Sequence, residues 1–182
     1  MIGHAKVYTV FWGSEINKEI KSEMPNFYNS VLNSDHMDWL TEYNTNIPAK
    51  DGRAGTNQSI GRGTYGGTFE IKPTTFSFNG VLDDSQIQIE LVRQIKAGVL
   101  PMPTADTLFM IHFPAGLSIT IPDGKGGVAT SCQQFCAYHM GFTTTNGVNV
   151  YYGVIPDLNS FACSMGCGFG NSMDRFTIAS SH

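Results

Sequence analysis

The sequence has few charged residues and no long hydrophobic run. Asp, Glu, Lys and Arg make up 14% of its 182 residues, and the formal net charge is −4. Because the Lys and Arg residues form no cluster, we expect no nucleic-acid partner. No apolar run approaches the roughly 18 residues of a membrane-spanning helix, so we expect no membrane span. The Gly-x-Ser-x-Gly motif of serine hydrolases is also absent.

What the chain does contain is typical of one folded extracellular domain. A length of 182 residues with 41% hydrophobic residues is enough for a single core, so residues 1–182 are interpreted as one domain or most of one. The 20 glycines and many Thr, Ser and Asn residues, together with the low charge, favour a secreted protein, with the periplasm as an alternative location.

The hydrophobic patterns predict a mixed α/β (α+β) fold with helices packed on a single mixed sheet. Strands are predicted at residues 6–12, 67–72, 74–78, 107–113, 117–121, 137–143 and 148–155. Helices are predicted between Ser14 and Leu32 with a break at Pro25 and Ser22 as a second cap, from Asp35 onwards, at residues 83–97, and at the C-terminus.

The four cysteines form two Cys-x-x-x-Cys pairs, at Cys132 and Cys136 and at Cys163 and Cys167. Four thiolates could hold structural zinc, but three intervening residues is an unusual spacing for such sites. Two disulfides in an oxidising compartment are favoured. Sequence alone leaves three connectivities open, and two short local loops are weakly preferred.

Other motifs have ordinary structural interpretations beside the functional ones. Residues 61–66 match Gly-x-Gly-x-x-Gly, but a strand pattern follows where a nucleotide site needs a helix, so the glycines are expected to allow a bulge or tight turn. His112 lies in an apolar strand and is expected to be a hydrogen-bonded core residue. His139 follows Cys136 closely and is expected to have a structural role, with metal binding as the alternative.

The C-terminal segment predicts an amphipathic helix that stops at a histidine. Ser172 or Asp174 can cap it, Phe176 and Ala179 recur at helical spacing, and no stop signal follows His182. Zinc peptidases carry His-Glu-x-x-His or a related motif on such a helix. His182 is therefore either the first ligand of a truncated zinc-binding helix or an incidental terminal histidine.

Several segments in this order resemble secreted bacterial relatives of the plant phosphate-induced, EXORDIUM-like proteins. The matching stretches span nearly the whole chain: residues 6–13, 38–44, 59–63, 107–113, 132–139, 152–157 and 178–182. In that family the last segment continues as His-Glu-Leu-x-Glu-x-x-Thr, which is similar to a zincin helix with glutamate in place of the second histidine.

The resemblance implies a zincin-like fold, of which this chain is the N-terminal part with a truncated C-terminal helix. His182 matches the first metal ligand, whereas the general-base glutamate and the other ligands would lie in a downstream fragment of the same protein. With one zinc ion bound, the complete site would activate a water molecule for hydrolysis of a peptide or protein substrate. We expect this chain alone to be inactive.

The alternative function is a non-catalytic extracellular module that binds cell wall, matrix or another protein, as the plant relatives suggest. A glutamate and a further ligand encoded directly after His182 would favour the enzyme, and their absence would favour the module.

Overall fold

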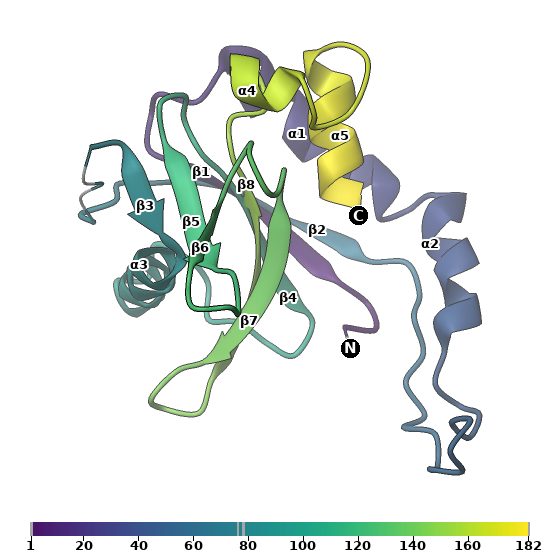
Figure 1. Cartoon of the computed structure of the whole chain (residues 1–182). Helices are drawn as coiled ribbons and strands as arrows, with labels where there is room; N and C mark the ends of the chain where they lie inside the picture. The colour runs from purple at the N-terminus through teal and green to yellow at the C-terminus, as the bar shows by residue number, and fades with distance from the viewer. Residues whose placement is uncertain (1, 76, 78, 182) are drawn as a thin grey trace.

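A five-stranded mixed sheet forms the centre of the molecule (Figure 1). The structure is a computed structural model that describes residues 2–75, 77 and 79–181. The strand order is β2-β1-β4-β8-β7, and the first four strands run parallel. The outermost strand, β7, runs antiparallel to β8 and lies at one edge. These strands are β1 (Lys6–Trp12), β2 (Thr64–Ile71), β4 (Thr107–His112), β7 (Tyr138–Thr143) and β8 (Asn149–Ile155).

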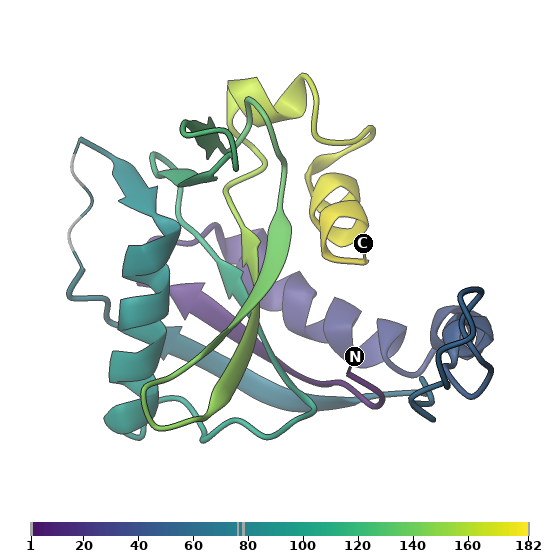
Figure 2. The ribbon, with the colours of Figure 1, turned by 60° about the horizontal axis from the view of Figure 1, so that its bottom comes forward.

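Helices cover both faces of this sheet (Figure 2). Helices α1 (Lys18–Val31) and α5 (Ser172–Ser181) lie on one face, and α3 (Asp84–Lys96) lies on the other. Alternate strand residues point to opposite faces, so Phe109 and Tyr152 join the core beneath α3, whereas Met110 and Ile155 join the core beneath α1 and α5. The expected mixed α/β class is thus confirmed.

The expectation of a single sheet was wrong, because a second sheet of three strands packs beside α3. Its order is β3-β5-β6, with β3 parallel to β5 and β6 antiparallel to it. The strands are β3 (Val81–Asp83), β5 (Ser118–Pro122) and β6 (Val128–Thr130). The alternating pattern of residues 117–121 indicates a strand, but it contains no information about which sheet that strand joins.

Helix α3 follows its sequence signals closely. Asp83 caps it by accepting a hydrogen bond from the Ser85 amide, and the Gln86 side chain accepts one from the Asp83 amide. Gly98 lies just beyond the helix with a φ of +70°, the left-handed conformation that glycine adopts without strain. The predicted capping box and glycine stop are both confirmed.

The predicted break in the first helix was wrong. Pro25 lies inside an uninterrupted α1, which begins after its cap Asn17. The Ser22 hydroxyl donates to the Glu19 carbonyl instead of capping a second segment. Burial of Met24 and Tyr28 on one side of α1 offsets the hydrogen bond that proline cannot donate.

Short helical segments complete the fold: α2 (Asp35–Trp39), the 3₁₀ helix η1 (Leu40–Tyr43) and α4 (Phe161–Ser164). The strand predicted at residues 74–78 is not formed at residues 74, 75 and 77, and Phe76 and Phe78 lie outside the described residues. The glycine motif ends inside β2, where it forms a bulge: Val7 pairs with Tyr65 and Tyr8 with Gly67, so Gly66 is the extra residue. The structural interpretation of that motif is confirmed.

Candidate functional site

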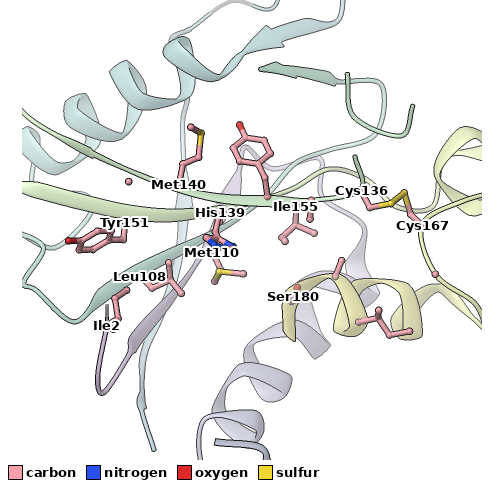
Figure 3. A pocket seen from close by; sticks show the side chains of 17 residues that line it. Ile2, Leu108, Met110, Cys136, His139, Met140, Tyr151, Ile155, Cys167 and Ser180 are labelled. Carbon is pink, nitrogen blue, oxygen red and sulfur yellow. A yellow bond between two sulfur atoms is a disulfide. The ribbon is translucent and has the colours of Figure 1, made fainter. Parts of the chain in front are cut away.

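A cleft of about 1000 Å³ opens between α5 and the edge strand β7 (Figure 3). Strands β4 and β8 form its floor with Leu108, Met110 and Tyr151. The last turn of α5, including Ala179 and Ser180, forms one wall, and β7 forms the other. The site therefore combines an open sheet edge with the end of a helix.

Glycines keep the floor of the cleft low. Gly153 lies directly opposite Met110 in the strand pairing, and Gly141 lies opposite Tyr151. A methyl group on Gly153 would come within 2.6 Å of the Met110 sulfur, and one on Gly141 within 2.7 Å of the Tyr151 ring. The large side chains therefore lie over glycines, where side chains of other residues would lift them into the cleft.

The two disulfides join the opposite walls of the cleft. Cys132 pairs with Cys163 and Cys136 with Cys167, and each bond spans 31 residues. The weakly preferred pairing into two local loops was therefore wrong. The bonds connect the segment that leads into β7 with the segment that leads into α5, two regions that become neighbours only in the folded chain.

The first turns of α5 are held to the residues after β8 and to the loop that leads into α5. The Asn171 side chain accepts from the Asp174 amide at 3.0 Å, and Asp174 accepts from the Asn171 amide at 2.8 Å. This reciprocal pair caps the helix one residue before the predicted Ser172, and Asp174 serves as the partner and not as the cap itself. The Arg175 guanidinium donates to the Leu158 and Gly170 carbonyls, and Phe176 is buried beneath the helix.

A chain of hydrogen bonds ties the last turn of α5 to the core. The Tyr28 hydroxyl lies 3.0 Å from Nε2 of His112 and donates to the Ser180 hydroxyl at 3.1 Å. With its proton directed to Ser180, Tyr28 accepts from Nε2–H of His112. Nδ1 of His112 is then unprotonated, buried and without a hydrogen-bond partner among the described residues. Burial lowers the pKa of His112 to about 3, so the ring is neutral at physiological pH. Its interpretation as a hydrogen-bonded core histidine is confirmed.

On the opposite face of the sheet, the buried carboxylate of Asp84 holds β7 in place. Asp84, at the start of α3, accepts from the Tyr138 hydroxyl at 2.6 Å, the Tyr152 hydroxyl at 2.7 Å and the Gln88 side chain at 2.7 Å. Burial and the bond to Asp84 raise the pKa of both tyrosines above its ordinary value. Sequence reasoning missed this cluster, because its tyrosines lie 54 and 68 residues from Asp84 and no local pattern links them.

A second carboxylate on α3 holds the loop that follows β2. Glu90 is buried and accepts hydrogen bonds from Arg93, Gln94, Thr74 and Thr75. Burial opposes ionisation of Glu90, but these bonds outweigh it and lower the pKa to about 2. The α3 face is therefore closed by two fully paired acidic groups.

The predicted metal ligand, His182, lies outside the described residues. Among the residues that the structure describes, no three His, Cys, Asp or Glu side chains gather to hold a metal ion. His139 lines the cleft, whereas His112 lies in the core behind it. All four cysteines are in disulfides, so they are not free to act as zinc ligands.

Comparison of the chain with protein-family models, with curated proteins and with solved structures finds no match. Across the described part of the chain, no helix has the length and apolar character required to cross a membrane.

Proposed function

We propose that this chain is the N-terminal part of a secreted zinc-dependent metallopeptidase-like protein, which hydrolyses peptide bonds once a downstream segment completes its site. The observation that carries this proposal is the placement of α5. Its last turn lines the cleft, directly before His182 in the sequence. Across from it lies β7, an edge strand of the sheet that the described residues form. A helix that carries metal ligands and an edge strand that aligns an extended peptide are the two parts that such an enzyme needs.

The chain supplies only part of a metal site. His182 is the one ligand that the resemblance assigns to it, and the described residues offer no complete ligand set. Zinc lowers the pKa of a bound water to about 7 and so provides hydroxide for attack on a carbonyl. The remaining ligands and the general base are expected downstream of His182. The chain's own contribution is to position α5 and to bind the substrate.

Secretion fits the two disulfides, which persist in oxidising compartments. They connect the walls of the cleft, and in the proposed enzyme they keep α5 and β7 at a constant separation.

A second candidate function is a non-catalytic extracellular binding module. It is favoured by three exposed apolar side chains next to the disulfides: Phe161 is 82% exposed, Met165 76% and Phe169 92%. Exposed apolar groups of this size on a braced loop are typical of contact surfaces.

The proposal is tested by expressing the gene through the residues that follow His182, and measuring zinc content and peptide hydrolysis. One zinc per chain and hydrolysis that a chelator abolishes are expected. His182→Ala should abolish both, whereas the control His36→Ala, on α2, should change neither. The proposal is contradicted if the protein binds no zinc, or if it keeps its zinc and activity after His182→Ala. The binding module would then be the remaining candidate function.

A further inference from the structure

The cleft lining contains no ionised carboxylate, ammonium or guanidinium group among the described residues. Its floor includes Leu108, Met110 and Tyr151, and His139 is the one described lining residue whose side chain carries nitrogen (Figure 3). A charged side chain entering here would lose water without gaining a partner, which is costly. An apolar side chain would gain by leaving water.

The cleft is deep enough for a large side chain because Gly141 and Gly153 lie in the strands that form it. Tyr151 lies over Gly141 and Met110 lies over Gly153, so the two large side chains do not fill the space between β7 and α5. The resulting volume of about 1000 Å³ accommodates an aromatic or long aliphatic group.

The edge of β7 favours a peptide as the ligand. In the described part of the chain β7 pairs only with β8, which leaves its outer backbone groups without a strand partner beside the cleft. An extended peptide that adds to this edge has alternate side chains directed to one face, and on the cleft side they meet the apolar floor.

We propose that the cleft selects an extended peptide by a bulky, uncharged apolar side chain, such as Leu, Met or Phe, that lies on Leu108, Met110 and Tyr151. This inference rests on the proposed function for its substrate class, but it concerns binding and requires neither zinc nor hydrolysis.

The test uses the 182-residue chain in the presence of a chelator and a panel of fluorescent peptides that differ at one position. Binding is followed by fluorescence anisotropy. Peptides with Leu or Phe at that position should bind about tenfold or more tightly than those with Ala, Asp or Lys. Equal affinities across the panel, or no binding at about 1 mM peptide, would overturn the proposal.

Two variants change the floor in opposite directions. Gly141→Ala should lift the Tyr151 ring and weaken binding of the Phe peptide more than that of the Leu peptide. Tyr151→Ala should enlarge the floor and shift the preference towards Trp. The matched control is Gly166→Ala, because a methyl group there meets nothing within 4 Å and Gly166 is not part of the cleft lining. Circular dichroism of each variant confirms that it is folded.

The outcomes separate this inference from the proposed function. Selective peptide binding by a protein that binds no zinc would support the apolar preference of the cleft and rule out the proposed peptidase function. Zinc-dependent hydrolysis with no preference for apolar residues would support the proposed peptidase function and rule out the apolar preference.

Discussion

Beneath α3 the sheet is closed around two buried carboxylates, whereas beneath α5 it opens into a cleft without charged side chains. Side chains of β7 and β8 donate hydrogen bonds to Asp84, and α3 and the loop after β2 donate them to Glu90. The α3 face is therefore a rigid support for β7 and for that loop. On the other face, glycines replace side chains and the helix wall is held by disulfides and a neutral hydrogen-bond chain. The polar interactions of the scaffold are therefore concentrated away from the proposed binding surface.

The largest expected effect comes from removing both disulfides by changing all four cysteines to serine. A cross-link over 31 residues contributes about 3.5 kcal/mol, and we expect about 4 kcal/mol for both, since the two bonds restrain nearly the same segments. Removing one alone should cost less than half of that. Urea unfolding measures the loss, and hydrogen exchange should increase in α5 but not in α3. Additive losses from the two single removals would contradict this account.

The second largest effect is expected from Asp84→Ala, which removes the buried hydrogen-bond acceptor on the α3 face. Three buried or half-buried donors lose their acceptor, and we expect a loss of about 3 kcal/mol in the free energy of unfolding. The control Gln88→Ala removes one donor and keeps the bonds from Tyr138 and Tyr152, so it should cost about 1 kcal/mol. If Asp84→Ala left stability unchanged in urea unfolding, the role of Asp84 as the anchor of β7 would be wrong.

His112 makes stability depend on pH. Its pKa is lowered from the ordinary 6.5 to about 3 by burial, so below pH 6.5 the unfolded chain binds a proton that the folded chain does not. Stability should fall as the pH decreases from 6.5 to 5, by about 2 kcal/mol in total.

His112→Gln should remove that slope, whereas His36→Gln should keep it. The measurement is urea unfolding at intervals between pH 5 and 7, above the range in which carboxylates such as Glu90 gain protons. A slope that persists in His112→Gln would assign it to another group.

The smallest effects distinguish two neighbouring tyrosines on β8. Tyr152→Phe removes a buried hydroxyl that donates to Asp84, and it should cost about 1 kcal/mol. Tyr151→Phe should change stability by less than about 0.5 kcal/mol, because its side chain borders the open cleft and no hydrogen bond joins its hydroxyl to the described residues. Thermal unfolding of both variants checks this contrast, and equal losses would remove the distinction between the faces.

Local sequence patterns correctly predicted many elements of the fold. The buried strand β1, the capping box of α3 and the amphipathic α5 are readable because each depends on residues within a few positions of one another. The break predicted at Pro25 was wrong for the complementary reason: the buried contacts of Met24 and Tyr28 with distant elements offset a local cost.

The sequence by itself determined most of the longer strands and helices, that α5 is amphipathic, and that the chain has few charges to place in a site, but it missed short elements such as β3, β6 and α4. Only the tertiary structure decided which cysteines pair, which tyrosines meet Asp84, and that β7 and α5 enclose a cleft. The physical reason is distance along the chain: these partners are 30 to 70 residues apart, and strand order, which no local pattern specifies, brings them together.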